Sequence, residues 1–222
     1  MTQPTRAAIF DMDGLLIDSE PLWHEAEVEI FGRLGVPLER AETRSTKGMF
    51  VDEVVAYWQS RFPWEGPSAE SVSEEILARV GELVLAKGTP MPGAAETVVA
   101  MAERGPIALA SSTPHVLITI VLAHLGLSEA FPLICSAQDE EYGKPNPAVF
   151  LTAAAQLGID PERCCVFEDA PAGVLAAKAA RMACVAVPEA SERTNPQVLI
   201  ADLILESLNG FDPDWIDQIY AE

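Results

Sequence analysis

The chain has 222 residues, 49% of them hydrophobic, which fits one folded domain that carries a sizeable insertion. Its 34 acidic and 14 basic side chains give a formal net charge of -20, which argues against nucleic acids and anionic membranes as partners because both repel such a surface. The longest apolar stretch, residues 116–127, is shorter than the roughly 18 residues of a membrane span, and the N-terminus lacks a signal peptide pattern, so we expect a cytoplasmic protein.

The first predicted strand, Ala7–Phe10, is followed by a segment of different character. Residues 16–88 show no strand alternation, and their apolar residues recur at helical spacing. Helices are expected from Ser19, as a capping residue, to Leu34, and then at Val51–Arg61 and Ser71–Leu85. We therefore expect a small helical cap domain at residues 16–88, inserted after the first strand, and a core domain formed by residues 1–15 and 89–222.

After residue 88, short apolar runs alternate with Ala- and Leu-rich segments, which is typical of a parallel sheet covered by helices. The predicted fold class is therefore α/β. Each predicted helix begins near a proline or ends at a glycine, as helix boundaries often do. The strands expected here are Ile107–Ala110, Leu133–Cys135, Cys164–Phe167, Cys184–Val187 and Leu203–Leu205, and the helices are Gly93–Glu103, Pro114–Leu125, Pro147–Leu157, Pro171–Met182 and a terminal one at Phe211–Tyr220.

The four cysteines lie within apolar, strand-like runs and show no CxxC spacing. This pattern predicts reduced, buried thiols and argues against disulfides or a zinc site. The three histidines show no ligand spacing either, so no transition-metal site is expected.

Polar residues follow four of the predicted strands at the point where each strand ends. Ligands of open α/β sheets bind outside the carboxyl ends of the strands, so these residues are expected to line one crevice. They are Asp11 and Asp13, Ser111 and Ser112, Lys144 in the loop after the third strand, and Glu168 with Asp169.

Several carboxylates in one crevice repel one another unless a cation lies between them, and a hard cation such as Mg²⁺ prefers oxygen ligands. Each residue also has a structural interpretation. Asp11 and Asp13 could form a turn before Gly14, Asp169 could cap the next helix, and Lys144 could be a surface lysine. The joint occurrence at separate strand ends favours catalysis, with Ser111 at a helix N-terminus suited to bind phosphate.

Together, these residues resemble the four motifs of the haloacid dehalogenase superfamily, in order and across the whole chain: Asp11-Met12-Asp13-Gly14, Ser111, Lys144 and Glu168-Asp169. The resemblance implies a Rossmann-like core with the helical insertion as its cap. It implies that Asp11 is the nucleophile that accepts a phosphoryl group and that Asp13 protonates the leaving alkoxide and then activates water. Lys144 and Ser111 would bind the phosphate, with Ser112 beside them. Mg²⁺ would be held by Asp11, the main-chain carbonyl of Asp13, Asp169 and Glu168.

The segment DMDGLLIDSEPLW at residues 11–23 and the cap segment around Trp58 are similar to the branch of that superfamily that contains hexitol and 2-deoxyglucose-6-phosphate phosphatases. The similarity implies hydrolysis of small sugar or sugar-alcohol phosphates. A monomer is the default expectation for the oligomeric state. Glu20 and Lys47 are the preferred candidates for substrate contact in the cap, whereas Trp23 and Trp58 are expected in its core. A phosphomutase like β-phosphoglucomutase and a catalytically idle binding protein are the alternatives.

Overall fold

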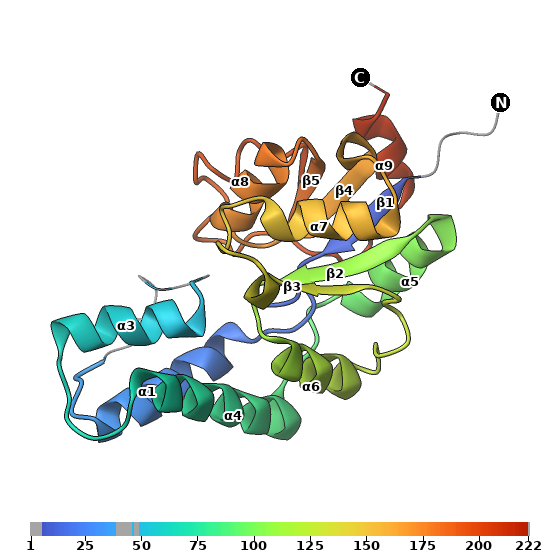
Figure 1. Ribbon diagram of the computed structural model, residues 1–222. Coiled ribbons are helices and arrows are strands. Elements are labelled where there is room, and N and C mark those ends of the chain that lie inside the picture. The colour runs from blue at the N-terminus through green and yellow to red at the C-terminus, as the bar shows by residue number, and fades with distance from the viewer. Residues whose placement is uncertain (1–5, 39–45, 47–48, 222) are drawn as a thin grey trace.

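The computed structural model describes residues 6–38, 46 and 49–221, and its centre is a six-stranded sheet (Figure 1). All neighbouring strands are parallel, in the order β3-β2-β1-β4-β5-β6, which confirms the predicted α/β class. The strands are β1 (Ala7–Phe10), β2 (Ile107–Ser111), β3 (Ile134–Ser136), β4 (Cys164–Glu168), β5 (Ala183–Ala186) and β6 (Leu203–Ile204).

Helices cover both faces of the sheet. Alternate residues of each strand point to opposite faces, so Ala8 and Phe10 of β1 belong to one apolar cluster and Ala7 and Ile9 to the other. The first cluster includes residues of α5 (Ala94–Arg104), α6 (His115–Leu125) and α9 (Asp214–Ile219), and the second includes residues of α7 (Ala148–Leu157) and α8 (Pro171–Ala179). The sheet is thus buried on both sides, which explains its continuous apolar strand sequences.

Three helices of the inserted segment lie together beyond the carboxyl end of the sheet (Figure 1). They are α1 (Glu20–Arg33), α3 (Val51–Arg61) and α4 (Ala69–Lys87). The main chain enters and leaves this segment side by side, because Asp18 N donates to Thr89 O and Met91 N donates to Leu16 O. Helix α4 also packs on α6 of the core, where a Cβ at Gly81 would lie 3.1 Å from Ile120 Cδ1. The division at residues 16–88 stays a prediction.

Some element boundaries differ from the predictions for reasons of backbone pairing. Strand β2 includes Ser111 and β4 includes Glu168, because the ladders to Ser136 and Ala186 continue through these polar residues. Helix α8 ends before the predicted Met182, since Arg181 adopts a left-handed conformation with φ 62°. All four cysteines are free and buried, as predicted. Among the described residues, no helix is both long and apolar enough to cross a membrane.

Candidate active site

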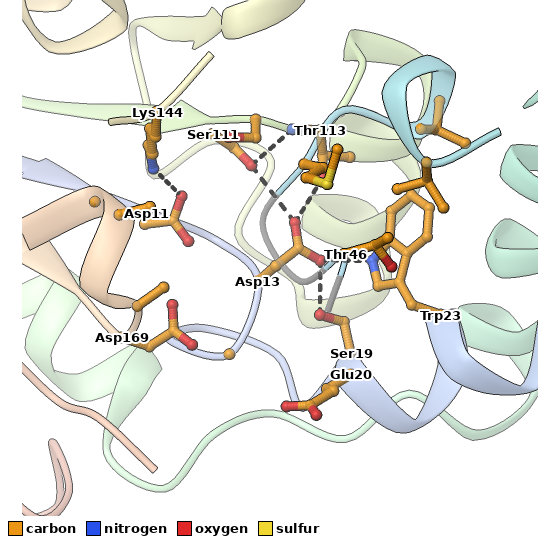
Figure 2. Close-up of a pocket in the computed structure, with 18 of the residues that line it drawn as sticks. Asp11, Asp13, Ser19, Glu20, Trp23, Thr46, Ser111, Thr113, Lys144 and Asp169 are labelled. Atoms are coloured by element: carbon orange, nitrogen blue, oxygen red, sulfur yellow. Dashed lines mark hydrogen bonds and ion pairs between the residues drawn. The ribbon is translucent and has the colours of Figure 1, made fainter. Parts of the chain in front are cut away.

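A pocket opens between the carboxyl ends of the strands and helix α1 of the inserted segment (Figure 2). The sheet side of the pocket contains the residues predicted from the strand ends, including Ser112. The other side contains residues from α1 and α3 and from the chain between them. Those on the sheet side include Asp11, Asp13, Ser111, Ser112, Thr113, Lys144, Glu168 and Asp169, and those on the other side include Glu20, Trp23, His24, Glu27, Thr46 and Met49.

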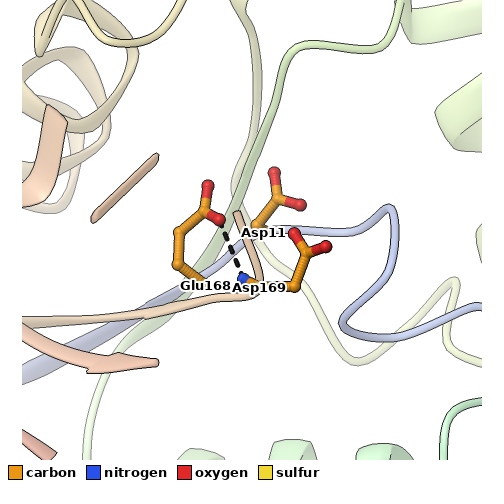
Figure 3. Close-up of side chains that lie close together, drawn as sticks. All are labelled: Asp11, Glu168 and Asp169. Carbon is orange, nitrogen blue, oxygen red and sulfur yellow. Dashed lines mark hydrogen bonds between the residues drawn. The ribbon is translucent and has the colours of Figure 1, made fainter. Parts of the chain in front are cut away.

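Three buried carboxylates gather at the base of this pocket (Figure 3). Asp11, Glu168 and Asp169 each place a carboxylate oxygen within 4.8 Å of the others. Asp11 follows β1 directly, while Glu168 ends the neighbouring strand β4, so the adjacent parallel strands bring them together. The three carboxylates offer only oxygen donors, which is the chemistry that Mg²⁺ prefers.

Lys144 neutralises part of this negative charge. Its Nζ lies 2.5 Å from Asp11 Oδ1 and 2.8 Å from Glu168 Oε1, and its side chain is only 5% exposed. A third hydrogen bond, of 3.3 Å, reaches the main-chain oxygen of Ala110. The lysine is therefore a fixed cation inside the site, and the surface-lysine interpretation of this loop is wrong.

The electrostatics of the pair follow from burial and from opposite charges. Burial, together with the negative charges of Glu168 and Asp13, raises the pKa of Asp11 to about 7, although Lys144 acts in the other direction. The carboxylates of Asp11 and Glu168 raise the pKa of Lys144 despite its burial, so this lysine stays charged. Lys144 thus stands against three buried acids, and a further cation would relieve the remaining repulsion.

Glu168 has a structural task as well. Its Oε2 accepts hydrogen bonds from the main-chain N–H groups of Asp169 (2.8 Å) and Ala170 (2.9 Å). A Cβ at Gly173, in the first turn of α8, would lie 1.7 Å from Glu168 Oε1. Glycine is therefore required at position 173 for the Glu168 carboxylate to lie against the N-terminus of α8. The side chain that binds the N–H groups before α8 is thus Glu168, while the N-cap residue Ala170 has no side-chain cap.

The carboxylate of Asp13 lies outside the group of three and has different partners (Figure 2). Its Oδ1 accepts from Ser19 Oγ at 2.6 Å and from Trp23 Nε1 at 3.2 Å. Its Oδ2 accepts from Thr113 Oγ1 at 2.6 Å and from Ser111 Oγ at 3.5 Å. Asp11 is therefore held by a cation, whereas Asp13 is held by neutral donors, two of which come from the beginning of the inserted segment.

The structure also shows which site residues the sequence did not reveal. Ser19 was expected only as a helix cap, but its hydroxyl donates to Asp13 and makes no cap hydrogen bond. Trp23 was expected in the core of the cap and instead reaches Asp13 and lines the pocket, while Trp58 is only 2% exposed and does lie in the core. Thr113 was expected among the polar residues that follow the second predicted strand but was given no role, and its hydroxyl donates to Asp13.

Of the two preferred cap candidates, Glu20 lines the pocket, and Lys47 lies outside the described residues. Met49, from the chain before α3, lines the pocket too. Glu27 is a further acidic residue of the pocket wall that sequence reasoning missed. The spacing of residues 20, 23, 24 and 27 could have predicted its position, since these residues fall on one face of a helix.

Comparison with known proteins agrees with this geometry. The family model described as haloacid dehalogenase-like hydrolase matches residues 5–181. Hexitol phosphatase B of Escherichia coli (strain K12) is 43% identical over 204 residues, which cover 91% of this chain and 92% of that protein. Validoxylamine A 7'-phosphate phosphatase of Streptomyces hygroscopicus subsp. limoneus is 33% identical over 202 residues, covering 89% and 94%.

The fold has close structural counterparts. The crystal structure of β-phosphoglucomutase from Clostridium difficile superimposes with a TM-score of 0.84 at 25% sequence identity, covering 98% of both chains. The chain therefore belongs to the haloacid dehalogenase-like hydrolases. It is an enzyme, a hydrolase of phosphoric monoesters.

Proposed function

We propose that this protein is a Mg²⁺-dependent phosphatase that hydrolyses small sugar or sugar-alcohol phosphates through an aspartyl-phosphate intermediate. The observation that carries the proposal is the pair formed by Asp11 and Lys144 at the base of the pocket, with Asp13 beside it on neutral donors. The substrate class is supported by the relative named hexitol phosphatase B, whose similarity extends over 91% of this chain, including the inserted segment.

In the first step, a carboxylate oxygen of Asp11 attacks the phosphorus atom, and the bond from phosphorus to the ester oxygen breaks. Lys144 reduces the repulsion between the anionic nucleophile and the anionic phosphate. Asp13, which takes up a proton from solvent before this step, gives that proton to the departing alkoxide, so the leaving group departs as a neutral alcohol. The phosphoryl group now forms an acyl phosphate with Asp11, and one displacement is divided into two easier ones.

In the second step, water attacks the phosphorus atom of the acyl phosphate. Asp13, now a carboxylate, accepts a proton from this water, and the Asp11 carboxylate leaves as inorganic phosphate forms. The hydroxyls of Ser111 and Ser112 and the ammonium group of Lys144 are proposed to hold the phosphate oxygens. Because Ser19 and Trp23 belong to the inserted segment and hold Asp13, closure of the proposed cap over a substrate would also fix this acid.

The residues at the base of the pocket fit Mg²⁺. Asp11 and Asp169 would hold the ion with the main-chain carbonyl of Asp13. Glu168 would add negative charge beside them, since both of its oxygens already accept hydrogen bonds. When bound, Mg²⁺ would neutralise charge on the nucleophile and on the phosphate oxygens.

Gly14 provides a test of this metal site, because a Cβ at Gly14 would lie 2.2 Å from Asp169 Oδ2. Gly14→Ala should displace the Asp169 carboxylate. The variant is expected to need at least about tenfold more Mg²⁺ for half-maximal activity, as the loss of an ordering contact to a metal ligand commonly does. The measurement is a Mg²⁺ titration of EDTA-treated protein, which should be inactive until the ion is restored.

Gly210→Ala is the matched control for this titration. Both glycines have φ 77°, so both substitutions carry the same backbone cost, but no atom lies within 4 Å of a Cβ at Gly210. Equal Mg²⁺ requirements of the two variants, or activity that EDTA leaves intact, would contradict the proposed site.

A substrate panel tests the reaction itself. Phosphate release should be measured with sorbitol 6-phosphate, mannitol 1-phosphate, glucose 6-phosphate, β-glucose 1-phosphate, glycolate 2-phosphate and a nucleoside monophosphate, ranked by kcat/KM. We expect the hexitol and hexose phosphates to rank first. A phosphomutase would instead interconvert β-glucose 1-phosphate and glucose 6-phosphate without net phosphate release, and that result would refute the proposal.

A further inference from the structure

Glu27 is a buried acid that the proposed reaction does not use. It lies on α1, is 7% exposed, and lines the same pocket as Asp11 and Asp13. Among the described residues, none forms a hydrogen bond or an ion pair with its carboxylate. Its neighbours on the same helix differ in this respect, because the exposed Glu25 and Glu29 are paired with Lys87 and Arg79.

Such a carboxylate is unfavourable for the fold. Burial raises the pKa of Glu27 to about 7, which reflects the cost of keeping a charge in a poorly solvated place without a partner. An apolar residue at this position would pack in the cap at no such cost. The stability of the protein therefore does not explain the acid, and its position at the pocket wall points to a ligand.

The place of Glu27 along α1 defines which part of a ligand it would meet. Helix α1 begins beside the phosphate-binding end of the pocket, where Trp23 contacts Asp13 (Figure 2). Glu27 follows Trp23 by four residues, on the same face and about 6 Å further along the helix axis. Thr46, Val51 and Val54 line the pocket with it. A ligand that extends several carbon atoms beyond its phosphate would reach this position.

We propose that Glu27 is a specificity residue that accepts hydrogen bonds from hydroxyl groups at the end of the substrate remote from the phosphate. This inference rests on the proposed phosphatase function and adds the group that selects the substrate. A carboxylate has two acceptor oxygens and no donor when ionised, which suits a pair of neighbouring hydroxyls. The apolar groups of Val51, Val54 and Trp23 are suited to pack against the C–H groups of the same chain.

The test compares two phosphate donors that differ in reach. Glu27→Met removes the acceptor at similar volume, Glu27→Gln retains one acceptor oxygen, and Glu29→Met is the matched control on the exposed side of α1. For each protein, kcat/KM is measured with sorbitol 6-phosphate and with acetyl phosphate, which has no distal hydroxyl. We expect Glu27→Met to lower the ratio of kcat/KM for sorbitol 6-phosphate to kcat/KM for acetyl phosphate by about 10- to 100-fold, as the loss of hydrogen bonds to a charged group predicts. Glu27→Gln should fall between wild type and Glu27→Met, and Glu29→Met should keep the wild-type ratio.

Thermal unfolding supplies a readout that does not depend on activity. Glu27→Met should raise Tm at pH 8 by a few degrees, because it removes an unpartnered buried charge. A lower Tm together with an unchanged ratio would assign Glu27 to the fold and overturn the inference. A second result would also overturn the inference: wild type prefers glucosamine 6-phosphate to glucose 6-phosphate, and Glu27→Gln abolishes that preference. The substrate group that Glu27 binds would then be an ammonium group and not a hydroxyl group. The proposed function itself fails separately, if wild type releases no phosphate from sorbitol 6-phosphate.

Discussion

Asp11→Asn is expected to reduce phosphate release by at least about 10³-fold, because the reaction depends on a covalent bond to this carboxylate and loss of a nucleophile has effects of that order or larger. The side chain keeps its shape, so the pocket and the fold should persist. The measurement is kcat with the best substrate of the panel, together with the circular dichroism spectrum of the variant.

The same substitution should not destabilise the protein near neutral pH. Burial raises the pKa of Asp11 in the folded state to about 7, well above the ordinary value of an aspartate in an unfolded chain. Between these two values the folded protein keeps a proton that the unfolded chain has released. The contribution of Asp11 to stability is therefore present below pH 4 and is lost as the pH rises through 7. At pH 8, Asp11→Asn should unfold at or above the wild-type Tm. Asp52→Asn, at an exposed position of α3, is the control and should change neither Tm nor kcat.

Lys144→Met is expected to have the largest combined effect on stability and rate. The substitution leaves Asp11 and Glu168 buried without the cation that lies 2.5 Å and 2.8 Å from them, and breaking a buried ion pair in this way costs about 3–5 kcal/mol. The rate should fall by about 10²- to 10³-fold, since a charged group aimed at the transferring phosphate is lost. The measurements are urea unfolding at pH 8 and kcat.

Lys178→Met is the matched control, because Lys178 pairs with Asp202 at a partly exposed position, where an ion pair contributes about 1 kcal/mol or less. The loss of stability in Lys144→Met should be smaller at pH 5, because protonation of Asp11 removes the charge that the substitution leaves without a partner. Lys144→Arg keeps the cation and should recover stability but little activity, since guanidinium and ammonium groups differ in shape. Equal losses of stability in Lys144→Met and Lys178→Met would contradict the assignment of Lys144 as the buried cation that neutralises Asp11 and Glu168.

The sequence predicted the sheet well because its strands are buried on both faces and so appear as uninterrupted apolar runs. The sequence also predicted that Asp11, Lys144 and Glu168 lie close together, because the carboxyl ends of parallel strands lie at the same edge of a sheet. Strands β2 and β4 each extend one residue beyond the end of the apolar run that predicts them. Backbone pairing does not require an apolar side chain, and Ser111 and Glu168 stay in the ladder.

The partners of Asp13 could not be predicted in the same way. Ser19 and Trp23 reach Asp13 only because the chain enters the inserted segment beside its own exit and turns α1 across the pocket. That turn combines local hydrogen bonds, from Leu16 N to Met12 O and from Gly14 N to Ile17 O, with the distant one from Asp18 N to Thr89 O. Glu27 was missed for a related reason: a glutamate in a polar helix sequence appears solvent-exposed until the packing of α1 shows that it is buried.

The most direct test of the central claim is to trap the intermediate. The enzyme is mixed with sorbitol 6-phosphate and Mg²⁺, quenched in acid within the first turnover, digested, and analysed by mass spectrometry. We predict a phosphoryl group on the peptide that contains Asp11, on the side chain of that residue, which disappears when the quench is delayed until substrate is exhausted. Turnover of sorbitol 6-phosphate with no phosphorylated peptide at any quench time, or with the phosphoryl group on another residue, would contradict the account.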